Sequence, residues 1–292
     1  MQLGRTNGDG SYARGFAMAT VGIVVVSPDA LLVRLIETDV WTLLFWRGLL
    51  SALALGVFLA ARHRSATPEI LRTIGRLDVV AALLMAASMV LFVIAIRLTT
   101  VANTLVIFAT MPLFAAGLGR VFLREAVPRQ TWIAVATVLA GIAVIFAGSL
   151  GGGNPVGDLS AIGAAFSFAG ALVICRRTRA VDMAPTVALS GLILAVVAAP
   201  LATPLAVDAR SLAYLLVLGA LVIPISFVLL VTAPRYLPAP DVALVMLLEA
   251  VLGPLWVWLV LAEVPARETF LGGAVILGTL ILLAVHGVRH NR

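Results

Sequence analysis

The chain has 292 residues, of which 62% are hydrophobic and only 12% charged, with a mean hydropathy of +1.13 and a formal net charge of +6. A soluble globular domain carries about 25% charged residues, so this composition excludes an ordinary water-soluble fold. All 20 basic residues are arginine and there is one cysteine, which excludes a P-loop nucleotide site, Schiff-base chemistry and a disulfide framework within the chain.

The apolar segments have the length of membrane spans. A bilayer core of about 30 Å requires about 20 apolar residues in each helix. The sequence therefore predicts an all-α integral membrane protein with ten transmembrane helices, and leaves no room for a sizeable soluble domain. We expect the helices at 13–33, 40–61, 78–97, 101–123, 128–148, 157–176, 184–206, 211–232, 240–262 and 268–287.

The arginines in the loops predict the orientation. Fifteen lie on the side of the two termini and four, including Arg34 and Arg97, lie on the other side, while Arg47 falls within the second span. Cytoplasmic loops of membrane proteins are enriched in arginine. We therefore expect both termini in the cytoplasm, and we attribute the net positive charge to topology and not to a nucleic-acid partner.

The two halves of the chain resemble each other at an offset of 138 residues. The segment Leu123–Leu139 aligns with Leu261–Leu277, and the alignment places Glu125 on Glu263. Matching charged residues in one register are not expected from unrelated apolar helices. The sequence therefore predicts an internal duplication.

The duplication divides the chain into a first repeat of five helices (1–150), a Gly-rich linker (151–156) and a second repeat of five helices (157–292). Because five is odd, the second repeat must enter the membrane from the opposite side. Two inverted five-helix repeats are a common architecture of secondary transporters.

Several motifs then point to one family. The segment Arg97–Phe146, the sequence LLFWRGLL (Leu43–Leu50) and the segment Gly157–Arg177 resemble the EamA type of the drug/metabolite transporter superfamily. The second copy departs from the family pattern, because Glu249 is followed by alanine where the family has proline. Pro254 lies a few residues further on.

The resemblance implies a carrier of small organic solutes in the bacterial inner membrane. We expect a secondary transporter that is not driven by ATP and works by alternating access, most simply an exporter of amino acids or amino-acid-like compounds. An importer of another metabolite class and an integral membrane lipid-modifying enzyme remain alternatives. With three histidines and no clustered acidic motif, we expect no catalytic residue, cofactor or metal site.

Charged residues at membrane depth are costly and need a partner or a function. Asp29 follows Pro28 near the outer end of the first span, and Arg47 lies at a similar depth in the second span. We predict an ion pair between them, with Arg34 as a competing partner for Asp29. The pair could be a fixed structural bridge or could contact the charged ends of a substrate.

Glu249 lies near the middle of the ninth span, without a neutralising neighbour in the sequence. Burial disfavours the charged form of a carboxyl group, which suits a residue that carries a proton or meets a substrate amine. A protonated side chain bonded to another helix is the alternative. Met246 and Trp256 share the face of Glu249 at helical spacing. In the repeat register Glu249 corresponds to Met111.

Phe108 lies on the face of Met111. If the face of Met111, which is apolar, and the face of Glu249, which is acidic, both line the site, an amphipathic solute is the natural ligand. Ser88 and Asn103 are polar residues within spans and are candidates for substrate contact, although such groups more often bond neighbouring helices. We also expect four prolines to kink their helices: Pro28, Pro112, Pro224 and Pro254. The protein could be a monomer or a homodimer.

Overall fold

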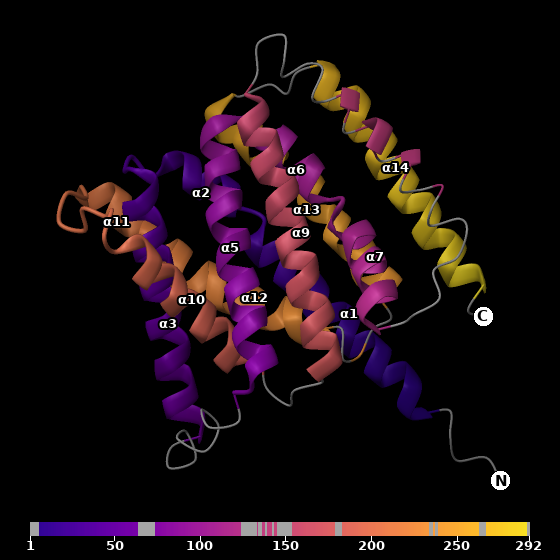
Figure 1. The fold of residues 1–292 in the computed structure, drawn as a ribbon, viewed down its shortest axis with the longest axis horizontal. Helices are drawn as coiled ribbons and strands as arrows, with labels where there is room; N and C mark the ends of the chain where they lie inside the picture. The colour runs from indigo at the N-terminus through magenta and orange to yellow at the C-terminus, as the bar shows by residue number, and fades with distance from the viewer. Residues whose placement is uncertain are drawn as a thin grey trace.

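Every regular element in the described part of the chain is a helix (Figure 1). The structure is a computed structural model that describes residues 6–63, 74–123, 133, 136–137, 139–141, 143–144, 154–178, 183–233, 236, 239–262 and 267–290. The helices are α1 (Thr6–Val26), α2 (Asp29–Leu35), α3 (Val40–His63), α5 (Arg76–Leu98), α6 (Val101–Phe108), α7 (Met111–Leu123), α9 (Pro155–Thr178), α10 (Ala184–Ala198), α11 (Ala209–Leu216), the π-helix η2 (Val217–Val222), α12 (Ile223–Thr232), α13 (Ala239–Leu261) and α14 (Arg267–His290).

Several of these helices are long and apolar enough to cross a membrane. Within the described residues six stretches qualify: Arg14–Leu35, Val40–Arg62, Arg76–Leu98, Val101–Phe122, Pro155–Cys175 and Ala209–Thr232. Three apolar helices are shorter: Ala184–Ala198, Leu248–Leu261 and Phe270–Thr279. The fold is thus that of an all-α, multi-pass membrane protein. The full number of ten spans stays a prediction, because most of the span expected at 128–148 lies outside the described residues.

One predicted span is wrong in its extent. The sequence predicted a helix over 184–206, but α10 ends at Ala198 and residues 199–208 form turns and irregular backbone. Pro200 and Pro204 lie in this segment, and proline cannot donate a backbone hydrogen bond. Apolar composition alone therefore overestimated the length of the helix.

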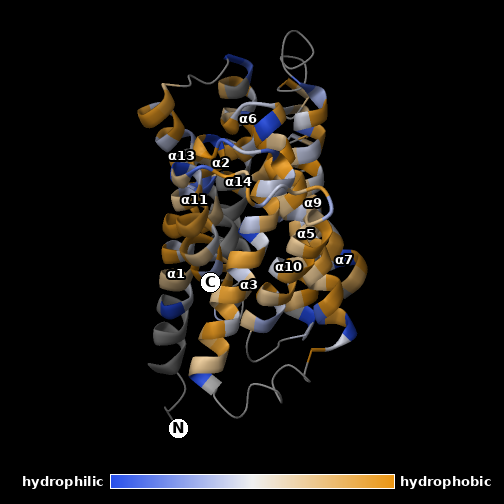
Figure 2. Ribbon diagram, turned by 90° about the vertical axis from the view of Figure 1, so that its left-hand side faces the viewer, coloured by the Kyte–Doolittle hydropathy of each residue, from blue (hydrophilic) through white to orange (hydrophobic). Residues whose placement is uncertain are grey.

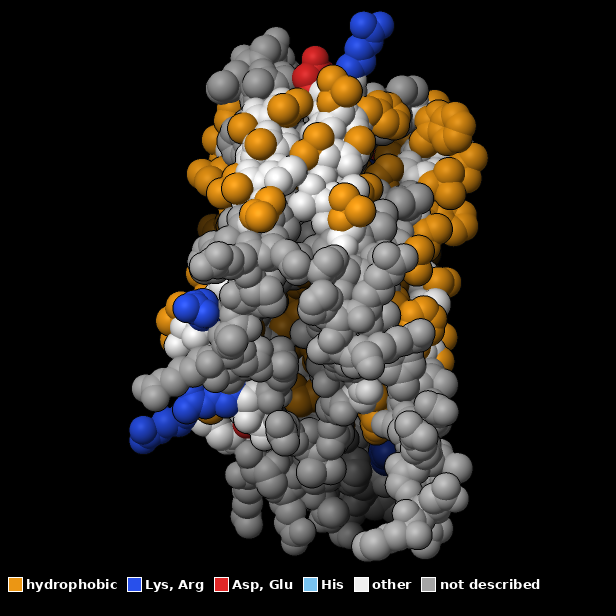
Figure 3. Space-filling view, turned by 90° about the vertical axis from the view of Figure 1, so that its right-hand side faces the viewer, with side chains coloured by type: hydrophobic (Ala, Val, Ile, Leu, Met, Phe, Trp, Pro, Cys, Tyr) orange, Lys and Arg blue, Asp and Glu red, His pale blue; other side chains and the backbone are white. Residues whose placement is uncertain are grey.

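The outer surface of the helix bundle is apolar. Hydrophobic residues extend along most of each helix, and hydrophilic residues gather mainly near the two ends of the molecule (Figure 2). Apolar side chains also cover much of the described surface in Figure 3. Val121 is 70% exposed and Leu282 is 72% exposed. Such a surface matches the hydrocarbon core of a bilayer, where every backbone polar group must be satisfied within the helices.

Helices of the two halves pack against each other. Helix α9 lies against α5, α6 and α7, while α1 lies against α12 and α13. Helix α3 crosses α10 where Gly48 meets Gly191. A Cβ atom added to Gly48 would lie 2.5 Å from the Gly191 carbonyl oxygen, and one added to Gly191 would lie 2.8 Å from the Gly48 carbonyl oxygen. The two backbones are therefore in direct contact at this crossing.

Helix α14 packs against other segments of the chain through two glycines, Gly272 and Gly273. A Cβ atom added to Gly141 would lie 3.0 Å from the Gly272 carbonyl oxygen, and one added to Gly273 would lie 3.3 Å from a methyl group of Val106. These glycines of α14 therefore serve contacts inside one chain. Whether the protein is a monomer or a homodimer stays open as a prediction.

Candidate functional site

The first span is interrupted at Ser27 and Pro28, between α1 and α2. Pro28 has no N–H group, so the Val24 carbonyl loses its usual helical donor. The Ser27 hydroxyl replaces that donor and bonds the Val24 oxygen at 2.9 Å. Helix α2 then begins at Asp29, which is buried. The break thus places a carboxyl group inside the bundle at the start of a new helix.

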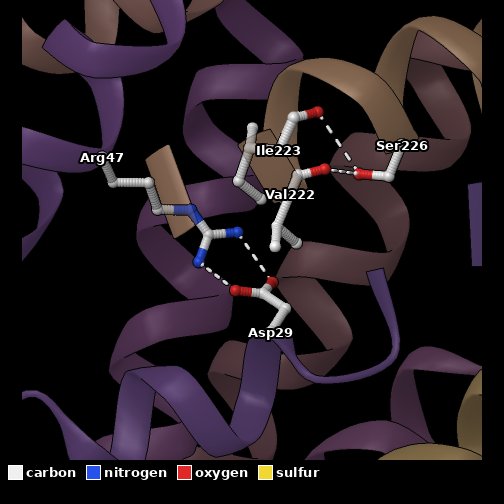
Figure 4. A network of polar contacts seen from close by, with 5 residues as sticks. All are labelled: Asp29, Arg47, Val222, Ile223 and Ser226. Carbon is white, nitrogen blue, oxygen red and sulfur yellow. Dashed lines mark hydrogen bonds and ion pairs between the residues drawn. The ribbon is translucent and has the colours of Figure 1, made fainter. Parts of the chain in front are cut away.

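The carboxylate of Asp29 is paired with the guanidinium of Arg47 on α3, as the sequence predicted (Figure 4). Nη1 donates to Oδ1 at 2.7 Å and Nη2 donates to Oδ2 at 2.8 Å. Both side chains are almost fully buried. A two-bond pair of this geometry fixes the direction of both groups. Arg34 does not take Asp29 as its partner, because its Nη2 donates to the Thr99 carbonyl at 2.7 Å.

The π-helix η2 lets α3 approach closely beside the ion pair. A Cβ atom added to Gly219 would lie 2.8 Å from Cβ of Leu50 and 3.4 Å from Cα of Arg47. Pro224 follows η2 and cannot donate to the carbonyl four residues before it, while the Ile223 amide bonds the Leu218 carbonyl five residues before it. Proline thus accounts for the widened turn.

A cavity opens beside the ion pair, and the residues that line it come from eight helices. The space between atoms there is about 420 Å³, and part of this space is open to the surroundings of the molecule. Its lining combines charged, aromatic and aliphatic side chains: Val26, Asp29, Arg47, Ser88, Met89, Phe92, Phe108, Phe168, Phe227, Leu230, Met246 and Glu249. Pockets that are mainly apolar with a few convergent polar groups are typical sites for small molecules.

Four phenylalanines form a continuous aromatic chain along the cavity. The ring centroids of Phe92 and Phe108 are 5.3 Å apart, those of Phe108 and Phe168 are 6.0 Å apart, and those of Phe168 and Phe227 are 5.5 Å apart. The rings come from α5, α6, α9 and α12. Both halves of the chain therefore contribute to one apolar wall.

A second cavity adjoins the first at the break between α6 and α7. It comprises about 290 Å³ of space, and its lining includes Phe108, Met111, Pro112, Met246 and Glu249. The break follows from Pro112, which cannot donate to the Phe108 carbonyl. The repeat register paired Met111 with Glu249, and the two residues face this same cavity from opposite halves of the chain.

Glu249 is partly buried on α13 and lines both cavities. It forms no hydrogen bond or ion pair with any residue that the structure describes, although the charges of Asp29 and Arg47 lie close enough to act on it. Of the residues proposed from the sequence, the two cavities bring together seven: Asp29, Arg47, Ser88, Phe108, Met111, Met246 and Glu249.

Two of the proposed residues lie elsewhere. Trp256 is outside both cavities and is 41% exposed, and its indole N–H donates to the Ser27 hydroxyl at 3.0 Å. Asn103 lies in the first turn of α6, where its amide N–H bonds the Thr100 hydroxyl at 3.1 Å. Trp256 thus connects α13 to the break after α1, and Thr100 caps α6 by accepting from Asn103. Ser88 faces the cavity but also donates to the Ala164 carbonyl at 2.9 Å, which joins α5 to α9.

Proline residues do not all have the same effect. Pro28 and Pro112 lie at breaks between helices, and Pro224 follows the π-helix. Pro254 lies inside α13, which continues through it without interruption. The kink expected at Pro254 therefore stays a prediction.

Sequence reasoning missed the aromatic chain, apart from Phe108. Phe92, Phe168 and Phe227 are ordinary residues for apolar helices, and no local pattern separates a cavity ring from a packed one. Their shared property is convergence from different helices, which appears only in the folded chain.

Two arginines join the ends of α2 and α5. Arg34 in the last turn of α2 donates to the carbonyl of Thr99, the C-cap residue of α5. Arg97 in the last turn of α5 donates to the carbonyl of Ile36, the C-cap residue of α2, at 2.8 Å. We call these four residues the arginine clasp. Cations near helix C-termini are favourable because carbonyl groups there lack helical donors.

Comparison with known proteins identifies the family. The model of the EamA-like transporter family matches residues 15–147 and 155–285, which together make up nearly the whole chain. The chain belongs to the EamA-like transporter family. This EamA-like transporter contains two EamA domains, so the duplication seen in the sequence is reflected in two separate matches.

Solved structures show the same fold. Eighteen chains match this EamA-like transporter. One crystal structure has a TM-score of 0.69 and 18% sequence identity, and the match covers 97% of this chain and 99% of the other. At this identity the likeness shows the fold alone. No curated protein matches the chain.

Proposed function

We propose that this EamA-like transporter is a secondary transporter that moves small organic metabolites by alternating access. Export of amino acids or amino-acid-like compounds is the first activity to test. The family supports transport across a membrane. The solute, the direction and the mechanism belong to the proposal.

One observation carries the proposal. Asp29 and Arg47 from the first domain and Glu249 from the second reach the same cavity within an apolar bundle. Ionisable groups within membrane spans are rare and mark pathways for substrates or ions. A site built by both domains changes its access when the domains move against each other, which is the requirement for alternating access.

Two further features support movement of one half against the other. At the glycine crossing of α3 and α10 the two halves meet through backbone atoms of Gly48 and Gly191, without a side chain on either residue. The breaks at Pro28 and Pro112 allow the ends of two spans to move separately from their other halves. The arginine clasp joins α2 to α5 at the end of the bundle where both helices finish.

The arginine distribution supports an orientation with both termini in the cytoplasm, and the bacterial inner membrane is the location that the family resemblance implies. In that orientation the arginine clasp faces the outside of the cell. Its two hydrogen bonds then join α2 to α5 at the outer end, which supports a state closed on that side. Vesicles of known orientation that carry a protease-sensitive tag at either terminus test this arrangement.

Transport itself is tested in proteoliposomes. The purified protein is reconstituted with a mixture of labelled amino acids and organic acids inside, and efflux is compared with that of protein-free liposomes. Efflux without ATP supports the proposal. A protein that accelerates no solute in either direction contradicts it.

Proton coupling is a separate part of the proposal and rests on Glu249. A carboxyl group without a fixed partner can exchange a proton as the cavity opens to either side. A proton gradient should then drive solute movement in the wild type but not in Glu249→Gln. If this variant transports with the same pH dependence as the wild type, coupling through Glu249 is wrong while transport stands.

A further inference from the structure

The charged groups in the cavity do not balance. Asp29 and Arg47 neutralise each other through two short bonds. Glu249 lines the same cavity and pairs with no residue that the structure describes. Of the side chains that line the cavity, Arg47 is the one cation. An ionised Glu249 therefore leaves the cavity with one negative charge in excess.

The rest of the lining suits an apolar body that carries a cation. Four phenyl rings surround the space, and the contacts of Phe92 with Phe108 and of Phe168 with Phe227 are edge-to-face. Ring faces attract cations within about 6 Å through their negative quadrupole. Met89 and Met246 add flexible, polarisable side chains to the same wall.

We propose that the preferred solute is an organic cation, with one net positive charge on an apolar body of about the size of a phenyl ring. This proposal rests on the transport of small organic metabolites proposed above, and among such metabolites it places organic cations ahead of amino acids. The cationic group lies next to Glu249 and supplies the charge that the cavity lacks. The apolar body lies against the phenylalanine rings.

The ion pair disfavours solutes that carry a carboxylate. Both terminal nitrogens of Arg47 are bonded to Asp29, and the arginine side chain is 1% exposed. A solute carboxylate could form a two-bond pair with the two terminal nitrogens of Arg47 only by displacing Asp29, which would then be buried without a partner. A carboxylate elsewhere in the cavity would meet the like charge of Glu249. A zwitterionic amino acid is therefore a poorer ligand than a cation with the same side chain.

Three probes with the same phenyl ring test this order. They are (2-phenylethyl)trimethylammonium, which has a fixed positive charge, phenylalanine, which has no net charge, and 3-phenylpropionate, which is an anion. Initial rates of uptake into proteoliposomes are measured for each probe, and the rates in protein-free liposomes are subtracted. We expect the cation to enter at least about ten times faster than either of the others.

Substitutions at Glu249 test whether this residue sets the preference. Glu249→Gln removes the charge and should lower the ratio of cation to phenylalanine uptake by about tenfold or more. Glu249→Asp keeps the charge and should retain the preference. Glu268→Gln is the matched control, because Glu268 is exposed in the first turn of α14 and lies outside both cavities. Monodisperse elution in detergent confirms folding of each variant.

The outcomes separate this proposal from the transport function. If phenylalanine or 3-phenylpropionate enters the wild type as fast as the cation, the cation proposal is wrong and transport stands. The same conclusion holds if all three probes are inert while other metabolites move. If no solute moves faster than in protein-free liposomes, both proposals fail. If the preference for the cation survives in Glu249→Gln, Glu249 does not set it, and the cation proposal is wrong.

Discussion

Gly48 and Gly191 occupy reciprocal positions at the crossing of α3 and α10. The space for a Cβ atom on Gly48 is filled by the Gly191 carbonyl and the Ala195 amide, and that on Gly191 by the Gly48 carbonyl and the Ala52 amide. Each glycine therefore contacts the glycine of the other helix and the residue four positions after that second glycine. This two-fold relationship between single residues lies between the two EamA domains.

The crossing should not tolerate a methyl group. We expect Gly48→Ala or Gly191→Ala to destabilise the protein by about 1–3 kcal/mol, because the new methyl group meets backbone atoms that cannot move independently. Thermal unfolding in detergent measures the effect. Gly56→Ala is the matched control on α3, since no atom lies within 4 Å of its added Cβ. Equal unfolding temperatures for Gly48→Ala and Gly56→Ala would contradict the close crossing.

The ion pair should behave as a unit. Asp29→Asn or Arg47→Met leaves the other charge buried without a partner, and each should cost about 3–5 kcal/mol. The double variant Asp29→Asn with Arg47→Met removes both charges and should lose less stability than the two single losses added together. Measuring the free energy of unfolding of the wild type, the two single variants and the double variant gives the coupling energy between Asp29 and Arg47. Strictly additive losses would mean that the two residues do not stabilise each other.

The arginine clasp should control access from its end of the bundle. Arg34→Ala combined with Arg97→Ala removes two bonds between the ends of α2 and α5. We expect faster labelling of a cysteine introduced at Met89, which lines the cavity, by an impermeant thiol reagent added on the clasp side. The test uses a Cys175→Ala background, because Cys175 is the single natural cysteine.

The control for the clasp is Arg210→Ala. Arg210 is an exposed arginine whose guanidinium bonds Tyr214 within its own helical segment at 3.2 Å. Its removal should leave the labelling rate unchanged. If the clasp variant also labels at the wild-type rate, the clasp does not close the cavity.

Asp39 should make a pH-dependent contribution to stability. Partial burial works to raise the pKa of its carboxyl group, but hydrogen bonds with Thr42, Thr203 and the Trp41 amide outweigh it and hold the pKa below the ordinary 3.8. A lowered folded-state pKa stabilises the fold above the ordinary value, and this contribution fades as the pH falls through the lowered one.

The measurement compares unfolding temperatures of the wild type and Asp39→Asn, which still accepts the amide bonds at the start of α3. The advantage of the wild type should be constant near neutral pH and should shrink as the pH falls below about 4. Thr203→Val removes one donor to the carboxyl group and should reduce the advantage. If the advantage of the wild type in unfolding temperature grew on acidification, the pKa of Asp39 would be raised in the folded state and not lowered.

The ion pair could be predicted from the sequence because charge is scarce. Asp29 and Arg47 have opposite charges at similar depth in consecutive spans, and a membrane interior forces such groups together. Glu249 could be located for the same reason. Its correspondence to Met111 followed from the repeat register, and the fold brings both residues to one cavity.

Other features depend on three-dimensional packing and could not be predicted. The π-helix before Pro224 has the same apolar composition as its neighbours, so no periodicity marks it. Trp256 shares a helical face with Glu249 in the sequence, yet in the fold its indole reaches Ser27 at the break between α1 and α2. The end of α10 was misplaced because apolar residues continue into a loop rich in proline.

The crossing of α3 and α10 has a consequence for the origin of the site. Arg47 precedes Gly48, and the residue in the corresponding place before Gly191 is Ser190, whose hydroxyl bonds the Val187 carbonyl at 2.7 Å. Two identical half-length chains assembled about such an axis would bring two arginines to it, each needing its own buried acid. Joining the halves in one polypeptide allows one of them to lose the charge. The single ion pair, and with it the unequal charge of the cavity, is available to a fused and diverged duplicate but not to two identical chains.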